Sequence, residues 1–81
     1  MNRYIALQKV INLGSFSKAA EEMGYSQSAT SQMIASLEKE LGLCLIHRSR
    51  YGIRLTHEGK QLYPKIEQLI VTYQSMIEKK Q

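Results

Sequence analysis

The feature that most constrains the fold is a three-residue break between two helix-forming segments. Gly24 can end the first segment, and Ser26 can cap a second that extends to about Leu41, where Gly42 follows. Glycine ends helices because it adopts the left-handed conformation without steric cost, and serine satisfies the first free N–H groups of a helix. A helix, a short turn containing glycine and a second helix form a helix-turn-helix, which the sequence therefore predicts around residues 24–26.

A first helix is predicted ahead of this motif. Apolar side chains recur at helical spacing and Gly14 supplies a stop, so the helix should extend from about Arg3 to Leu13. Phe16 follows as an expected core residue, and Ser17 is expected to cap the helix that leads into the turn. Three helices are thus predicted before residue 42.

A two-stranded hairpin is predicted after the third helix. Residues 45–48 and 53–55 read as short strands, and the stretch between them, residues 49–52, has the composition of a turn. Two strands alone are marginally stable, so the hairpin must pack on the helices as a wing. Residues 1–58 are therefore predicted to be mainly α, a winged helix-turn-helix with a three-helix core and a two-stranded wing.

A long last helix is predicted over residues 57–79. Thr56 is expected to cap it, and Pro64 inside it removes one backbone hydrogen bond and should bend the axis. Apolar residues recur at spacings of four and three, as in a heptad seam. Leu62 and Tyr63 are expected to pack on their own domain, whereas the seam from residue 66 onward is expected to meet a second copy. The predicted dimerisation residues are Ile66, Leu69, Ile70, Tyr73, Met76 and Ile77.

The third helix presents two different faces on a helical wheel. The side expected to be core carries Thr30, Met33, Ile34, Leu37 and Leu41. The opposite side is small and polar, and consists of Ser28, Ser31, Gln32, Ala35, Ser36 and Lys39, with Gln27 in the exposed first turn. Such a face fits a DNA major groove, where glutamine can pair with adenine N6 and N7. Taken alone, it is more typical of a solvated helix surface.

Positive charge is concentrated in one stretch of the chain. Between Cys44 and Lys65 a single acid, Glu58, stands against five basic residues, and this stretch supplies the whole net charge of +4: Arg48, Arg50, Arg54, Lys60 and Lys65. A basic strip favours a polyanionic partner, either nucleic acid or an anionic membrane. A membrane is less favoured because neither an aromatic-rich amphipathic face nor a spanning apolar run accompanies the strip. The division suggests that the neutral helix face reads bases while the wing neutralises phosphates.

The sequence contains no pattern of catalytic or metal-ligating residues. It has no aspartate, and its single cysteine, Cys44, excludes an intrachain disulfide and cannot form a two-cysteine zinc site with His47 or His57. Cys44 is expected to be a small, buried or half-buried side chain. We therefore expect neither an enzyme nor a bound cofactor. The lack of a signal peptide, with the lone cysteine, favours the cytoplasm.

Five short motifs occur in order along the chain: Ser15-Phe16-Ser17-Lys18-Ala19-Ala20, Ser26-Gln27-Ser28-Ala29-Thr30-Ser31-Gln32-Met33-Ile34, Leu37-Glu38-Lys39-Glu40-Leu41-Gly42, Leu45-Ile46-His47-Arg48 and Leu55-Thr56-His57-Glu58-Gly59. In order and spacing they resemble the amino-terminal DNA-binding domain of LysR-type transcriptional regulators. The resemblance covers nearly all 81 residues. Five linked motifs are far more specific than a generic helix-turn-helix pattern.

The resemblance implies roles for individual residues. Gln27, Ser28 and Ser31 would contact bases or the nearby backbone, and Gln32 would lie beside them. Arg50, at the tip of the wing, would approach the minor groove. Further contacts with the DNA backbone are expected from the third helix, the wing and the start of the last helix, namely from Ser26, Thr30, Lys39, Arg48, Tyr51, Arg54 and His57. Two positions depart from the family pattern, because arginine is usual where this chain has Gln32 and common where it has Tyr51.

The resemblance also implies an assembly and a missing part. Regulators of this family dimerise through the last helix, which would let two recognition helices address a palindromic operator in double-stranded DNA. They carry a larger carboxy-terminal domain that binds a small-molecule inducer. This chain is expected to be a DNA-binding fragment without that domain, and a natural stand-alone domain is the less favoured alternative. The expected location is the cytoplasm, on the nucleoid.

Two alternatives remain at this point. Winged helices also serve as protein–protein interaction modules, although the concentrated positive charge of the wing argues against that use here. Other winged DNA-binding families, such as MarR-like or molybdate-responsive regulators, are less compatible with the first and third motifs.

Overall fold

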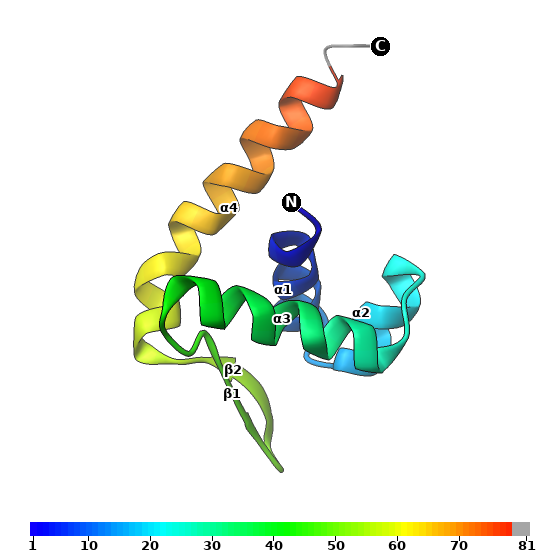
Figure 1. Ribbon diagram of the computed structural model, residues 1–81, viewed down its shortest axis with the longest axis vertical. Coiled ribbons are helices and arrows are strands. Elements are labelled where there is room, and N and C mark those ends of the chain that lie inside the picture. Colours follow the sequence, from blue (N-terminus) through cyan, green and yellow to red (C-terminus); the bar gives the residue numbers. More distant parts are fainter. Residues whose placement is uncertain (79–81) are drawn as a thin grey trace.

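The computed structural model describes residues 1–78 and contains four helices and a two-stranded antiparallel sheet (Figure 1). The elements are α1 (Asn2–Leu13), α2 (Phe16–Met23), α3 (Gln27–Leu41), β1 (Ile46–Ser49), β2 (Gly52–Leu55) and α4 (His57–Glu78). The hairpin projects at one end of the long axis and α4 extends toward the other. The predicted winged helix-turn-helix with a long last helix is confirmed. The last predicted helical residue, number 79, lies outside the described part of the chain.

The turn of the helix-turn-helix forms as its sequence predicts. Gly24 adopts the left-handed conformation, with φ +77°, and ends α2. The Ser26 side chain accepts a hydrogen bond from the backbone N–H of Ala29 at 3.0 Å and so caps α3. The cap of α2 was predicted two residues too late: Ser15, not Ser17, accepts from the backbone N–H of Lys18. The helix already begins at Phe16 because Ser15 can cap it.

All four helices contribute to one hydrophobic core. Its fully or nearly buried members are Leu7, Val10, Phe16, Ala19, Ile34, Leu37, Leu45, Tyr63, Ile66 and Ile70. Two of these correct the sequence-based picture, since Ile66 and Ile70 were expected at a dimer interface and instead lie inside their own domain, 3% and 1% exposed. They are buried because α4 packs along α1 well beyond its first turns.

The wing is joined to the helices through the backbone around Leu45. The Glu38 carboxylate, on α3, accepts hydrogen bonds from the backbone N–H groups of Leu45 at 2.7 Å and Ile46 at 3.2 Å. The Leu45 carbonyl accepts from the backbone N–H of Thr56 at 2.9 Å. Because Leu45 is engaged in this way, β1 begins at Ile46, one residue later than predicted. The expectation that Cys44 is buried or half-buried is wrong, because its side chain is exposed. The neighbouring Leu45 is the residue that enters the core at this point of the chain.

The start of α4 packs closely on the same backbone. Thr56 donates its hydroxyl to the Cys44 carbonyl and accepts the backbone N–H of Gly59 at 3.0 Å, so it caps α4 as predicted. Gly59 is buried, and a Cβ atom there would collide with the Leu45 carbonyl oxygen. The glycine in the fifth motif therefore permits the close approach that orients the wing.

The two strands form a tight hairpin. Their register pairs Ile46 with Leu55 and Ser49 with Gly52, which leaves Arg50 and Tyr51 as the two turn residues. Gly52 has φ +118°, a conformation that side chains with a Cβ rarely adopt. The hairpin thus ends in two exposed side chains held away from the core. None of the helices described is long and apolar enough to cross a membrane.

Candidate nucleic-acid interface

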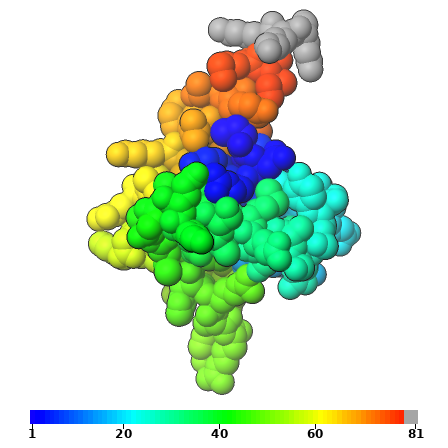
Figure 2. Space-filling view, viewed as in Figure 1, coloured from blue at the N-terminus to red at the C-terminus, as the bar shows by residue number. Residues whose placement is uncertain are grey.

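The outer face of α3 is the first component of the candidate site. Gln27, Ser28 and Gln32 are exposed, and Ser31 is half-buried. Figure 2 shows that α3 crosses one broad face of the molecule and that the hairpin protrudes beside it. A polar helix face and a projecting arm are therefore presented on the same side of the protein.

One predicted contact residue is not on this face. Thr30 is fully buried, and its hydroxyl donates to the Ser26 carbonyl at 3.0 Å. The helical wheel had placed it on the core side, and that placement is confirmed, whereas its predicted contact with the DNA backbone is wrong. The reason is geometric, because the Thr30 side chain lies on the core side of α3 and its hydroxyl proton is already donated to the Ser26 carbonyl.

Gln27 is linked to the preceding helix. The Ser17 hydroxyl lies 3.5 Å from Gln27 Oε1 and donates a long hydrogen bond to it. Ser17 thus has a part in the candidate site, although not as the cap of α2. The contact aligns the amide at the exposed start of α3, and it leaves the amide nitrogen free to donate outward.

Arg48 joins the wing to both helices of the helix-turn-helix. Its guanidinium carbon lies 3.6 Å from the centre of the Phe16 ring, and its Nη2 donates to Ser31 Oγ at 2.6 Å. We call these three residues the Arg48 bridge. Sequence reasoning had assigned Arg48 to phosphate and Phe16 to the core, and did not predict that they meet each other and a predicted base-reading serine. No spacing rule connects positions so distant in the chain.

The wing tip carries the second basic group. Arg50 Nη2 donates to the Tyr51 hydroxyl at 3.1 Å, and the guanidinium lies 5.1 Å from the Tyr51 ring centre. Tyr51 is 80% exposed, so the pair forms an exposed, positively charged tip. An arginine stacked on an aromatic ring keeps its charge while losing side-chain freedom.

The remaining predicted backbone-contact residues lie around these two groups. Lys39 is exposed in the last turn of α3, and Arg54 is exposed on β2, paired in register with His47. His57 is exposed in the first turn of α4, where its Nε2 lies 3.4 Å from the Gln61 side-chain nitrogen. Ser26, the last of the set, is exposed at the start of α3.

Both ion pairs found in residues 1–78 lie outside the wing, so the wing arginines keep their charge uncompensated. Arg3 pairs with Glu40 at 2.6 Å, and Lys9 pairs with Glu22 at 2.7 Å. No acidic residue occurs between Cys44 and His57, the segment that contains the wing. The positive potential is therefore concentrated where the polar face of α3 meets the hairpin. Within residues 1–78, no cluster of three metal-ligating side chains occurs.

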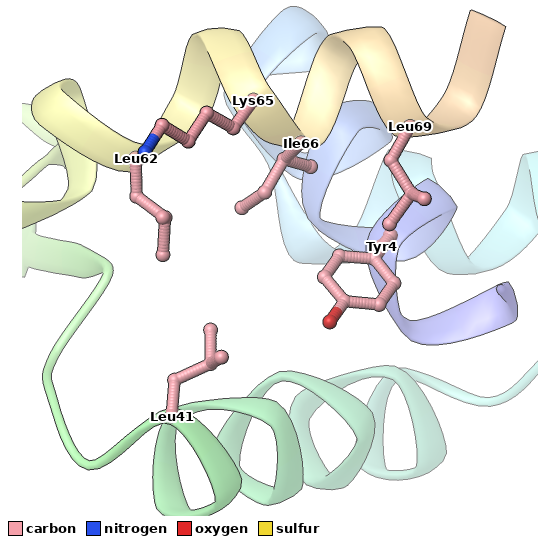
Figure 3. A pocket seen from close by; sticks show the side chains of 6 residues that line it. All are labelled: Tyr4, Leu41, Leu62, Lys65, Ile66 and Leu69. Carbon is pink, nitrogen blue, oxygen red and sulfur yellow. The ribbon is translucent and has the colours of Figure 1, made fainter. Parts of the chain in front are cut away.

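The far end of α4 carries the exposed part of the predicted dimerisation surface. Leu69, Met76 and Ile77 are exposed and Tyr73 is half-buried. Leu69 also lines a small groove between α1, α3 and α4, together with Tyr4, Leu41, Leu62, Lys65 and Ile66 (Figure 3). The seam that remains open is thus narrower than predicted, because two of its six members are in the core.

Comparison with known proteins identifies the class to which this fold and surface belong. The family model described as "Bacterial regulatory helix-turn-helix protein, lysR family" matches residues 1–60. The chain belongs to this family.

A curated relative supports the same family assignment. The chain is 38% identical over 71 residues to the "Probable HTH-type transcriptional regulator LrrA" of Synechococcus elongatus, which covers 88% of this chain and 24% of that protein. The chain therefore spans about a quarter of the length of this curated relative.

Solved structures show the same fold. The BenM DNA-binding domain in complex with benA site 1 DNA is 31% identical and has a TM-score of 0.81, and the match covers 96% of this chain and 85% of that one. The CbnR DNA-binding domain, solved in a complex with DNA, has a TM-score of 0.85 at 23% identity, over 98% of this chain and 91% of that one, and supports the fold alone.

Proposed function

We infer that this chain binds double-stranded DNA in a sequence-specific manner and that the binding serves transcription regulation. The observation that carries this function is the combination of an exposed, nearly neutral polar face on α3 with an unpaired basic wing beside it, on a LysR-family fold. Base edges are read by neutral polar side chains that reach into the groove, whereas phosphates are held by cations.

We propose the following division of roles on this surface. Gln27, Ser28, Ser31 and Gln32 read base edges in the major groove, since all four lie on the outer side of α3. The surrounding residues contact the sugar–phosphate backbone, with Arg50 at the wing tip entering the minor groove: Ser26, Lys39, Arg48, Arg50, Tyr51, Arg54 and His57. Because Gln32 stands where the family usually has arginine, one charged contact is replaced by an amide that can pair with a base.

The proposed unit of binding is a homodimer. Leu69, Met76 and Ile77 leave apolar surface exposed on the part of α4 that extends from the domain, with the half-buried Tyr73 among them. A two-fold axis through these residues would place two copies of α3 on one palindromic operator. In a longer regulator, an inducer would act through a separate domain.

Selection from a randomised duplex library tests the function directly. The 81-residue chain is incubated with 30-base-pair duplexes that contain a random central segment, and bound duplexes are recovered and sequenced over several rounds. We expect enrichment of a motif composed of two inverted half-sites. Gln27→Ala should flatten the preference at one or two positions of each half-site while non-specific affinity changes little, since a good base contact contributes about 1 to 3 kcal/mol of discrimination.

The matched control for this selection is Gln74→Ala, on the exposed side of α4. It should leave the enriched motif unchanged. Binding of duplexes without any enrichment over the input would contradict sequence-specific recognition, because charge alone accounts for non-specific affinity.

A further inference from the structure

The Arg48 bridge determines how Ser31 can form hydrogen bonds. A serine hydroxyl has one proton to donate and two lone pairs that accept, so an isolated serine pairs with either kind of partner. Here the guanidinium of Arg48, which has donors but no acceptor, occupies the Ser31 oxygen at 2.6 Å. The Ser31 proton cannot be donated back to Arg48, and it is left for a partner outside the protein.

The guanidinium is held in place by its second contact. It stacks on Phe16, with 3.6 Å between the guanidinium carbon and the ring centre, and Phe16 is itself 4% exposed and part of the core. A planar guanidinium can stack and donate at the same time, whereas a lysine ammonium cannot reproduce this geometry. The rigid core thus sets the position of the arginine, and the arginine sets the orientation of the Ser31 hydroxyl.

A charged donor also changes the strength of that hydroxyl. Hydrogen bonds in series polarise one another, so a hydroxyl that accepts from a cation becomes a better donor. In the major groove, the acceptors are purine N7, guanine O6 and thymine O4, while adenine N6 and cytosine N4 are donors. A hydroxyl that already accepts from a cation has its proton available for the first group, and its remaining lone pair is a weaker acceptor for the second.

We propose that Arg48 is a positioning residue that commits Ser31 to donate its hydroxyl proton to an acceptor on a base edge, and that Arg48 acts on base preference through Ser31. The proposal rests on the proposed function, since it requires Ser31 to face DNA bases. It gives Phe16, Ser31 and Arg48 one shared task. It also explains how the wing and the recognition helix, which are separate elements, are held in a fixed relation.

The test measures base preference in four variants. Ser31→Ala removes the hydroxyl, Arg48→Lys keeps the positive charge while removing the stacked donor, and the double variant removes both. Arg3→Lys is the matched control, a charge-conserving change of an arginine on α1 that pairs with Glu40 and has no proposed contact with DNA. The probe is the duplex recovered by library selection with the unchanged chain, and Kd is measured for it and for duplexes with each base pair of the half-site exchanged.

We expect Ser31→Ala and Arg48→Lys to lose preference at the same base pair, each by about tenfold, the size of one base contact. The double variant should lose no more than either single variant, because the two residues act as one unit. Arg3→Lys should keep the preference. Circular dichroism of each variant verifies that the helices are intact.

Affinity for a duplex with a base analogue gives a measurement that would not change if Arg48 only stabilised the fold. Where the affected base is a purine, replacement by its 7-deaza analogue deletes the N7 acceptor without changing Watson–Crick pairing. The unchanged chain should lose about tenfold in affinity for this duplex, whereas Ser31→Ala and Arg48→Lys should be insensitive to the replacement. Where the affected base is thymine, exchange of its pair serves the same purpose through O4.

The outcomes separate this proposal from the proposed function. If Ser31→Ala loses a preference that Arg48→Lys keeps, or if the losses add in the double variant, the role of Arg48 is overturned and sequence-specific binding stands. If the unchanged chain selects a motif and Ser31→Ala has the same base preferences, Ser31 is not a base-reading residue. The proposal for Arg48 is then overturned as well. If no motif is selected at all, the proposed function itself is overturned.

Discussion

Tyr63 places a hydroxyl group inside the core, and within residues 1–78 this group has no hydrogen-bond partner. Leaving a buried polar group unpaired costs about 1 to 3 kcal/mol. Burial, and secondarily the negative charge of Glu67, raises the pKa of Tyr63 above its ordinary value of 10.0. The ring is needed for packing, but its hydroxyl opposes folding.

Tyr63→Phe should therefore raise the free energy of unfolding, by up to about 1 kcal/mol, as measured by urea denaturation at pH 7. A second readout follows from the raised pKa. The folded state favours the neutral phenol over the phenolate. Titration of Tyr63 therefore leaves the free energy of unfolding unchanged below pH 10.0 and lowers it as the pH rises through the higher folded-state pKa. The unchanged protein should lose more stability above pH 10 than Tyr63→Phe does. A variant less stable than the original at pH 7 would mean that the hydroxyl has a partner.

Residue-scale expectations from sequence were reliable where the cause is local. Ser26 caps α3 and Gly24 ends α2 because both effects depend only on neighbouring backbone groups. The Arg48–Phe16 stack was not predictable, since it joins residues brought together only by the packed fold. The misassigned cap shows the limit even locally: Ser15 and Ser17 are both acceptable caps, and the position of Phe16 in the core selects the earlier one.

At the scale of elements, the attachment of the wing depends on the first turn of α4. Gly59 lies against the Leu45 carbonyl, which is the point where the backbone enters β1. Gly59→Ala would place a methyl group onto that carbonyl. The backbone must shift to relieve the contact, so we expect a loss of about 1 to 3 kcal/mol in the free energy of unfolding despite the higher helix propensity of alanine.

Urea denaturation of Gly59→Ala against Ser75→Ala measures this effect, because Ser75 is exposed on the same helix. The control should change stability by less than about 0.5 kcal/mol. If Gly59→Ala were as stable as the control, α4 and the wing would not be held together at this point.

The wing itself should contribute to affinity through charge. Arg50, stacked on Tyr51 at the exposed tip, is proposed to meet the DNA backbone from the minor groove. Arg50→Ala should weaken binding to all duplexes and lower the slope of log affinity against log salt by about one unit, because one fewer counterion is released. Titrations from low to moderate salt measure the slope. An unchanged slope would remove Arg50 from the phosphates, and Lys60→Ala, on α4, provides a comparison outside the wing.

At the scale of the whole molecule, α4 is where pattern and packing diverge most. A heptad-like seam shows that one side of a helix is apolar, but it does not show what covers each position. The structure assigns Ile66 and Ile70 to the core, while Leu69, Met76 and Ile77 remain exposed. Composition and motif order sufficed for the winged fold, since each element carries its own stop and cap signals. The division of α4 between core and open surface depends on how α1 and α4 cross, which no local signal encodes.

The exposed remainder of the seam leads to the last prediction. Leu69, 44% exposed, faces the same side as Tyr73 and Met76 at helical spacing, whereas Val71, 58% exposed, is rotated by about 200° around the helix. A charge buried without a partner in a dimer interface costs several kcal/mol. Leu69→Glu should therefore be a folded monomer, and Val71→Glu should remain a dimer. Sedimentation at micromolar concentration gives the oligomeric state, and circular dichroism verifies folding.

DNA binding then reports the consequence of losing the dimer. Leu69→Glu keeps its recognition helix, because the core around Leu7, Ile34 and Leu37 does not depend on the exposed seam. Its affinity for a palindromic site should fall far more than its affinity for a single half-site, since the second half-site is no longer bound at a high effective concentration. Val71→Glu should retain the full difference between the two sites. If the unchanged chain sediments as a monomer, or if Val71→Glu dissociates while Leu69→Glu does not, the dimer does not form through this side of α4.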